Sequence, residues 1–198
     1  VVVDSVGDSS KIASGAIRDT KNPRDILLAK TACKVIVNSG YFRNGFSIQT
    51  GSGGASLAVV KYLRQSMIEQ NVKASFALGG ITSHMVKLHK EGLIDHLIDV
   101  QSFDRVAAES LRDDPKHKEV SANEYASPDE PGAATKFLDI VILSALEVDT
   151  NFNVNVLVGS DGIIRGAIGG HPDTAADSAL SIVVCPLLRG RIPCIVDE

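Results

Sequence analysis

The segment FSIQTGSGGASLAVVKYL places a glycine turn between a short apolar run and an amphipathic stretch. The turn consists of Gly51, Ser52, Gly53 and Gly54. A strand that ends in G-x-G-G and continues into a helix exposes several backbone N–H groups at the positive helix N-terminus. Such a turn can hold a phosphate or stabilise an oxyanion. The same glycines also suit tight packing of strand against helix, so the motif alone leaves both interpretations open.

A second glycine cluster lies in RGAIGGHPDTAADSALSIVVCP, where Gly166, Gly169 and Gly170 precede His171. Two glycine turns in one domain suggest two edges of one pocket. The tripeptide HPD also occurs in chaperone J domains, but there it lies in a loop between helices. Here glycines precede it and a strand-like run follows, so we attribute that match to chance.

Three other kinds of site fit these residues poorly. The dinucleotide fingerprint fails because Ser56 occupies its third glycine position and the next strand ends at FALGG, with no acidic residue for a ribose hydroxyl. A helical zinc motif needs two histidines four residues apart, whereas His84 and His89 are five apart, and no metal is predicted. Ser52 does not lie in the G-x-S-x-G elbow of a serine nucleophile.

Alternating strands and helices must position these turns. Helical patterns are predicted at Asn22–Ser39, Gly54–Gln70 and Ser83–Glu91, with Asn22 as an N-cap and Pro23 at the first helical position. Strands are predicted at Val1–Asp4, Phe46–Gln49, Ala74–Leu78, Leu97–Gln101, Asp139–Ala145, Val154–Val158, Ser181–Cys185 and Cys194–Val196. This alternation predicts an α/β domain with a parallel sheet covered on both faces and ligands beyond the carboxyl ends of its strands.

Composition narrows the class of protein. The chain has 198 residues, 44% of them hydrophobic, which is enough for the core of one domain. A net charge of −4 argues against nucleic acid or an anionic membrane surface as a partner. No apolar run approaches the roughly 20 residues of a membrane span, and no leader opens the chain, so we expect a cytoplasmic protein.

The cysteines and the remaining segments add three expectations. Cys33, Cys185 and Cys194 show no C-x-x-C spacing and are expected to be buried thiols in a reducing compartment. Asp113–Pro131, rich in charges and proline, is predicted to be a long surface excursion. The strand-like ends and the missing initiator Met suggest that the natural polypeptide is longer.

Four segments in this order resemble the C-terminal domain of the citrate lyase α chain: GFSIQTGSGGASLAV, FALGGITSHMVKLHKEGLIDHLIDVQSFD, DIVILSALEVDTNFNVNV and GIIRGAIGGHPDTAADSALSIVVCPLLRGRIPCIVDE. The resemblance covers nearly the whole chain. More distantly, the chain is similar to the acetate and 4-hydroxybutyrate CoA-transferases. The resemblance implies a CoA-transferase-type α/β fold, with an open, mostly parallel sheet flanked by helices on both faces. It also implies that residues 1–198 are the C-terminal domain of a longer chain whose N-terminal domain is absent here.

The resemblance implies a transferase that converts acetyl-carrier protein and citrate into citryl-carrier protein and acetate. The carrier is a small protein, the γ chain, whose phosphoribosyl-dephospho-CoA arm acts as a substrate, so no permanently bound cofactor is expected. A lyase β chain would complete the complex, and an oligomer is expected. Two alternatives remain: a general acyl-CoA:carboxylate CoA-transferase, and a domain that only docks the carrier.

Such chemistry needs preorganised N–H donors and cations. Gly51, Ser52, Gly53 and Gly54 are the candidates for one wall of the pocket, and Gly169, Gly170 and His171 for the other. Citrate carboxylates need basic partners, for which Arg165, Arg189 and Arg191 are candidates, since arginine binds carboxylates in a bidentate fork. Solvated surface arginines are the simpler interpretation of all three.

One departure concerns the nucleophile. The distant CoA-transferases that form a glutamyl thioester place their glutamate in G-I-x-x-E-M, whereas GGITSHM has His84 at that position. A histidine cannot form a glutamyl anhydride, which favours direct transfer without a covalent enzyme thioester. Glu147 is the remaining candidate nucleophile in this chain. Glu147 could instead be a structural carboxylate, and His84 could simply start a helix at the rim of the crevice.

Overall fold

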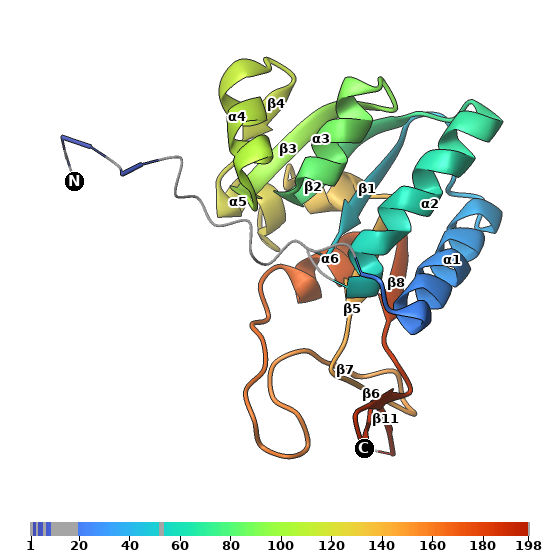
Figure 1. Cartoon of the computed structure of the whole chain (residues 1–198). Helices are drawn as coiled ribbons and strands as arrows, with labels where there is room; N and C mark the ends of the chain where they lie inside the picture. The colour runs from blue at the N-terminus through green and yellow to red at the C-terminus, as the bar shows by residue number, and fades with distance from the viewer. Residues whose placement is uncertain (1, 3, 6, 9–19, 52–53, 198) are drawn as a thin grey trace.

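A six-stranded sheet forms the centre of the computed structural model, which describes residues 2, 4–5, 7–8, 20–51 and 54–197 (Figure 1). The strand order is β4-β3-β2-β1-β5-β8, and every neighbouring pair is parallel. The strands are β1 (Phe46–Thr50), β2 (Ala74–Ile81), β3 (Ile94–Ser102), β4 (His117–Glu119), β5 (Ile140–Ser144) and β8 (Leu180–Val184). The predicted parallel sheet is confirmed.

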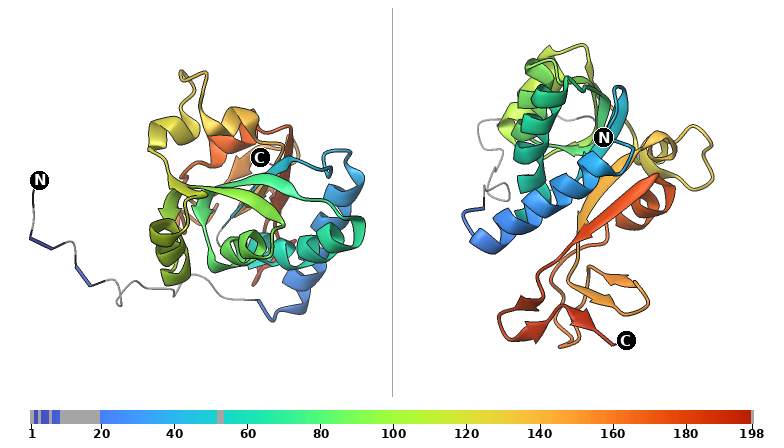
Figure 2. Two further views of the ribbon diagram at one scale, coloured as in Figure 1. Left: turned by 90° about the horizontal axis from the view of Figure 1, so that it is seen from above. Right: turned by 90° about the vertical axis from the view of Figure 1, so that its right-hand side faces the viewer.

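Helices cover both faces of this sheet, as the view from above shows (Figure 2). One face carries α1 (Pro23–Asn38), α2 (Gly54–Gln70), α3 (Ser83–Lys90) and α4 (Arg105–Asp113). The other carries α5 (Ala122–Ala126), the 3-10 helix η2 (Ala134–Phe137) and α6 (His171–Asp177). A sheet buried on both faces explains why its strands are nearly continuous apolar runs. The predicted α/β fold class is therefore confirmed.

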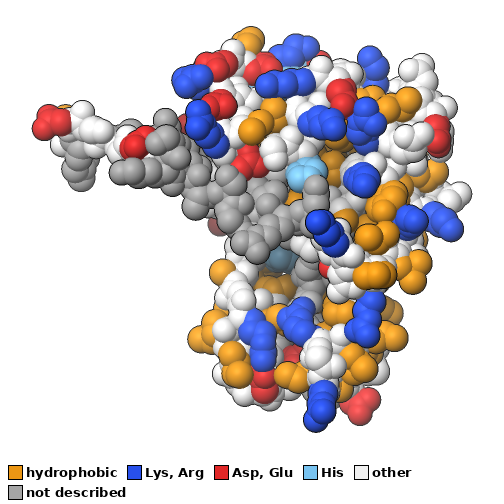
Figure 3. All heavy atoms as spheres, viewed as in Figure 1, with side chains coloured by type: hydrophobic (Ala, Val, Ile, Leu, Met, Phe, Trp, Pro, Cys, Tyr) orange, Lys and Arg blue, Asp and Glu red, His pale blue; other side chains and the backbone are white. Residues whose placement is uncertain are grey.

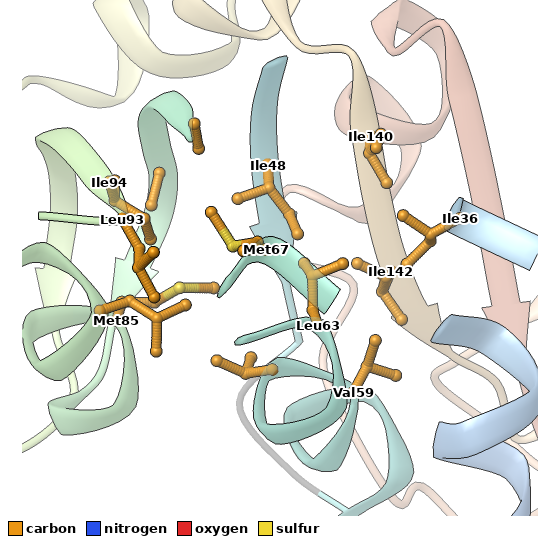
Figure 4. Packing of buried hydrophobic residues seen from close by; sticks show 14 of the residues in the cluster. Ile36, Ile48, Val59, Leu63, Met67, Met85, Leu93, Ile94, Ile140 and Ile142 are labelled. Atoms are coloured by element: carbon orange, nitrogen blue, oxygen red, sulfur yellow. The ribbon is translucent and has the colours of Figure 1, made fainter. Parts of the chain in front are cut away.

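The larger core lies between the sheet and the layer of α1 to α4. Ile48 of β1 and Ile142 of β5 belong to the same buried cluster as Leu63 and Met67 of α2 and Ile36 of α1 (Figure 4). Full burial of one such side chain contributes about 1.5–3 kcal/mol. This packing holds α2, and with it the first glycine turn, against the end of the sheet.

Side-chain caps fix where the helices of this layer begin. Asn22 accepts a hydrogen bond from the Arg24 N–H at 3.0 Å, as predicted, and Pro23 follows it. Asp104 is buried and caps two helices, because its carboxylate accepts the Ala107 N–H of α4 at 2.8 Å and the Ser83 N–H of α3 at 2.7 Å. The starts of α3 and α4 are thereby tied together.

A small β-structure lies below the sheet in Figure 1 and forms what we call the C-terminal lobe, residues 146–168 and 186–197. It contains the sheet β11-β6-β7 and the antiparallel pair β9–β10. Its strands are β6 (Glu147–Asp149), β7 (Val154–Asn155), β9 (Leu188–Arg189), β10 (Ile192–Pro193) and β11 (Ile195–Val196). The strand predicted at Val154–Val158 is shorter because Asn155 accepts the N–H groups of Leu157 and Val158 and turns the chain.

The segment Asp113–Pro131 lies mostly at the surface, as predicted, but it also contains regular structure that was not predicted. It provides the edge strand β4 and the helix α5, which covers the second face of the sheet. His117 of β4 is fully buried, and its ring contacts Asp99 of β3 at 3.2 Å and Ser110 of α4 at 3.0 Å. Because the segment is so rich in charged residues, the sequence gives no sign that His117 is buried and holds β4 against β3 and α4.

Two smaller expectations concern the N-terminus and the thiols. The strand predicted at Val1–Asp4 falls largely outside the described residues, since residues 1 and 3 are not described. Cys33 and Cys194 are buried and Cys185 is half-buried, and all three are free thiols. Burial raises the pKa of the Cys33 and Cys185 thiols, which makes them weak nucleophiles.

Replacing His117 with Ala should destabilise the protein by about 2–4 kcal/mol, because Asp99 would lose a partner inside the structure. The measurement is the free energy of unfolding in urea. His96→Ala is the control, since His96 lies on the neighbouring strand with a side chain that is 48% exposed. Equal effects of the two substitutions would show that the buried contact is unimportant.

Candidate active site at the carboxyl ends of β1 and β5

The first glycine turn directly follows β1. Gly51 donates its N–H to the Ile142 carbonyl of β5 at 2.8 Å, so this donor is already engaged by the sheet. A Cβ atom at Gly51 would lie 2.9 Å from Ser56 Oγ, which explains the need for glycine. Gly54 begins α2 with a φ of +56°, a conformation that glycine adopts without strain. The other two predicted residues of this turn, Ser52 and Gly53, lie outside the described residues.

The second glycine turn precedes α6. Gly169 has a φ of +50°, and Gly170 is the N-cap of the helix. A Cβ atom at Gly170 would lie 2.5 Å from the Tyr125 hydroxyl oxygen, so the turn packs directly on this tyrosine. His171 is the first residue of α6, and its Nε2 lies 3.2 Å from the Ser144 carbonyl oxygen.

The helices that follow the two turns both contact Ser144, the last residue of β5. The Ser144 hydroxyl donates to Ser56 Oγ in α2 at 3.2 Å, while its carbonyl oxygen contacts His171. The strand order runs outward in opposite directions from the β1–β5 pair, so this edge is the topological switch point where parallel α/β sheets bind ligands. The structure thus brings Gly51 and His171 to the end of β5, which α2, beginning at Gly54, also reaches through Ser56.

Sequence reasoning missed the residues that support the second turn. Tyr125 of α5 is buried and accepts a hydrogen bond from the Gln49 amide of β1 at 2.7 Å. Burial raises the pKa of the Tyr125 hydroxyl, which therefore stays protonated at neutral pH. Ser144 was also missed, although it directly follows the apolar run IVIL. Tyr125 gave no signal, because it lies in the charged segment Asp113–Pro131, where no helix was predicted.

Glu147 is buried in β6 of the C-terminal lobe. Its carboxylate accepts the Ser160 N–H at 2.7 Å and the Asn155 side-chain amide at 3.2 Å. The hydrogen bonds from Ser160, chiefly the one from its backbone, lower the pKa of the Glu147 carboxyl. These contacts are the ones expected of a carboxylate that holds backbone N–H groups in place.

The three candidate arginines are all in the C-terminal lobe. Arg165 forms a bidentate pair with Asp161 and holds the pKa of that carboxyl at about 2. Arg189 donates to the Ala145 carbonyl oxygen at 3.1 Å, one residue beyond Ser144, and so reaches the edge where the turns meet. Arg191 lies between β9 and β10 and is exposed.

Glu147, Arg165 and Arg189 surround one small cavity of about 10 Å³. That space holds about one water molecule and is too small for citrate. In this structure the space between the three side chains therefore does not admit a ligand of that size. Among the three candidate arginines, Arg189 is the one whose guanidinium contacts the backbone just beyond β5, at Ala145.

His84 lies in the first turn of α3 and lines a different space. A groove of about 650 Å³ runs between α2 and α3, with the basic side chains of Lys61, Arg64 and Lys87 along it. Arg64 is paired with Glu91 at 2.6 Å. The described residues that line this groove do not include any from the two glycine turns, so the structure separates His84 from His171.

Neither a metal centre nor a membrane span is found in the part of the chain that the structure describes. None of the described His, Cys, Asp and Glu side chains form a group of three or more arranged to hold a metal ion. None of the described helices is both long enough and apolar enough to cross a bilayer.

The fold and the site define an α/β protein with two glycine turns at the switch point of a parallel sheet, which is where sheets of this kind bind ligands. Comparison with known proteins gives the family: the family model described as citrate lyase, α subunit (CitF), matches residues 1–198, and the chain belongs to this family. The citrate lyase α chain of Escherichia coli (strain K12) is 61% identical over 198 residues, all of this chain and 39% of that protein.

Solved structures agree with this assignment. A structure described as the α subunit of citrate lyase in complex with citrate, from Streptococcus mutans, is 58% identical with a TM-score of 0.93, covering 99% of this chain and 39% of that one. The malonate decarboxylase α subunit of Acinetobacter baumannii, at 16% identity and a TM-score of 0.66 over 92% of this chain and 39% of that one, shares the fold. The chain spans about 40% of the length of the curated relatives it matches.

Replacing Gly170 with Ala should destabilise the protein by about 1–3 kcal/mol, because the new methyl group would overlap the buried Tyr125 ring. Gly132→Ala is the matched control, since a Cβ atom there would meet nothing closer than 3.5 Å. Urea unfolding of both variants gives the comparison. If Gly170→Ala unfolds like the control, the turn is not held by Tyr125.

The Glu147 carboxylate should stabilise the folded chain only while it is charged. Because its folded-state pKa is lowered, this contribution is complete above the ordinary glutamate pKa and is lost as the pH falls through the lowered value. Urea unfolding of the unsubstituted chain and of Glu147→Gln should therefore differ at pH 7 and converge in acid. A difference that does not change with pH would contradict this.

Proposed function

We propose that the chain is the C-terminal domain of a citrate lyase α subunit that exchanges the acyl group on a carrier thioester. Acetyl-carrier protein and citrate would give citryl-carrier protein and acetate. The proposal is supported by membership of the citrate lyase α family and by the structure from Streptococcus mutans, which is described as a complex with citrate. The structural observation that carries it is that α2 and α6, the helices that follow the two glycine turns, both contact Ser144 at the end of β5.

The reaction needs stabilised oxyanions more than a strong base. A citrate carboxylate oxygen would attack the acetyl thioester carbonyl, and the C–S bond would break to release the carrier thiolate and a mixed anhydride. The thiolate would then attack the citryl carbonyl, and acetate would leave. Both tetrahedral intermediates carry a negative oxygen, which backbone N–H groups at a helix N-terminus stabilise.

The described residues suit these steps unequally. The first turn of α2, which contains no acidic residue, would provide N–H donors on one side. His171 would act from the other side by exchanging its contact with the Ser144 carbonyl oxygen for one with the oxyanion. Gly51 would permit the close approach of Ser56 instead of donating, since its N–H is engaged. Arg189 would bind a citrate carboxylate, because it reaches the end of β5.

Direct transfer without an enzyme-bound thioester remains part of the proposal. His84 occupies the position at which the distant CoA-transferases have their glutamate, and Glu147 is engaged by Ser160 and Asn155. The phosphoribosyl-dephospho-CoA arm of the γ chain would be a substrate, with no permanently bound cofactor. A lyase β chain, an oligomeric assembly and a cytoplasmic location complete the proposal, together with an N-terminal domain outside residues 1–198.

The test uses the full-length subunit with acetyl-CoA and citrate, and mass spectrometry for a citryl thioester. Citramalate, acetate and propionate are run in parallel. Arg189→Gln should weaken the apparent affinity for citrate by about 10- to 100-fold, the range expected for one lost charged hydrogen bond. Arg191→Gln is the matched control and should behave like the unsubstituted chain. Borohydride should leave the mass of the protein unchanged, because no enzyme thioester forms.

Two outcomes would overturn the proposal. If citrate gives no citryl thioester while propionate exchanges readily, the protein is a general CoA-transferase. If the carrier protein binds but no carboxylate exchanges, the domain only docks the carrier.

A further inference from the structure

The C-terminal lobe has almost no apolar core of its own. All of its residues are described, and Cys194 is the one hydrophobic residue among them that is buried. Its strands are only two or three residues long. A sheet of this size does not form an independently stable unit without a packed face.

Exposed apolar side chains are concentrated in the same lobe. Of the sixteen exposed large hydrophobic residues among the described part of the chain, ten lie in the lobe. Phe152, Leu187 and Ile164 are 86%, 76% and 71% exposed. Figure 3 shows hydrophobic side chains spread over the lower lobe, whereas the upper body has more charged groups between them. Clustered apolar exposure of this kind marks an interaction surface.

Local polar contacts nevertheless give the lobe a defined conformation. The Asp149 carboxylate accepts the N–H groups of Asn151 and Asn153, both at 2.8 Å, and so orders the loop that presents Phe152. Asp161 pairs with Arg165 and orders the loop that presents Ile164. The apolar side chains are therefore displayed on a preformed surface, which lowers the entropy cost of covering them.

We propose that the exposed apolar surface of the lobe packs against the part of the full-length chain that lies outside residues 1–198. In the relatives, the matched region is 39–40% of the polypeptide, so more than half of such a chain needs a place to contact this domain. A segment in the same polypeptide meets the surface at a high effective concentration, which suits a face that is apolar and always covered. The inference rests on the domain assignment proposed above and not on the transfer reaction.

The position of the lobe adds a consequence for the site. Arg189 belongs to the lobe and donates a hydrogen bond to Ala145, the residue after Ser144. This hydrogen bond links the lobe to the end of β5, next to which the two glycine turns lie. Packing of the rest of the chain on the lobe would thereby fix the Arg189 guanidinium relative to Ser144.

The test is thiol labelling of the full-length chain with a maleimide, resolved by peptide mass spectrometry so that the native cysteines are scored separately. L187C and I164C place thiols on the lobe, and L27C places a control thiol on α1, where Leu27 is 66% exposed. The two lobe thiols should react at least ten times more slowly than the control in the native chain, and at equal rates in denaturant.

Equal native labelling rates at all three positions would overturn the inference. Protection that disappears on dilution, as copies of the protein dissociate, would also overturn it by assigning the surface to a second copy. Hydrogen exchange of the unsubstituted full-length chain provides the check that needs no substitution: the amides of residues 162–168 should exchange slowly. If the full-length L187C chain makes citryl thioester but its new thiol labels readily, this inference is wrong while the proposed function stands.

Discussion

The pairing of β1 with β5 is the constraint on which the rest of the structure depends. Ile48 pairs with Ile140 and Thr50 with Ile142, although about ninety residues separate the two strands in the sequence. The hydrogen bond from Gly51 to Ile142 extends this ladder into the first glycine turn. Because α2 leaves β1 on one face and α6 lies on the other, the two strand ends lie between helix N-termini of both layers.

Side-chain packing supports the backbone next to each turn. On one side, Ser56 of α2 contacts the Ser144 hydroxyl. On the other, Gln49 holds Tyr125, and Tyr125 lies against Gly170. Donors fixed in this way need no rearrangement when charge develops on a bound acyl group, which is the property that oxyanion stabilisation requires. Some polar groups of the C-terminal lobe differ, because they bind partners a few residues away, as Asp149 does with Asn151 and Asn153 and Asp161 does with Arg165.

The sequence predicted the local elements well where one strong signal was present. The helix at Gly54–Gln70 was predicted with its observed bounds, and the cap at Asn22 is present. The second face of the sheet was harder to predict, since α5 lies in a charged segment whose anchor is His117. A buried histidine paired with a distant carboxylate leaves no periodic pattern, so Asp99 and His117 could not be matched from the sequence.

The sequence by itself determined the class of the protein, because the periodicity of strands and helices and the two glycine turns are local patterns that can be recognised within a few consecutive residues. It also contained the family resemblance, which depends on motif order alone. Only the tertiary structure decided that α2 and α6 both contact Ser144, that Arg189 donates to Ala145 while Arg165 pairs with Asp161, and that His84 lines another groove. Those relations depend on strand order and side-chain packing, and both are set by contacts between residues far apart in the chain.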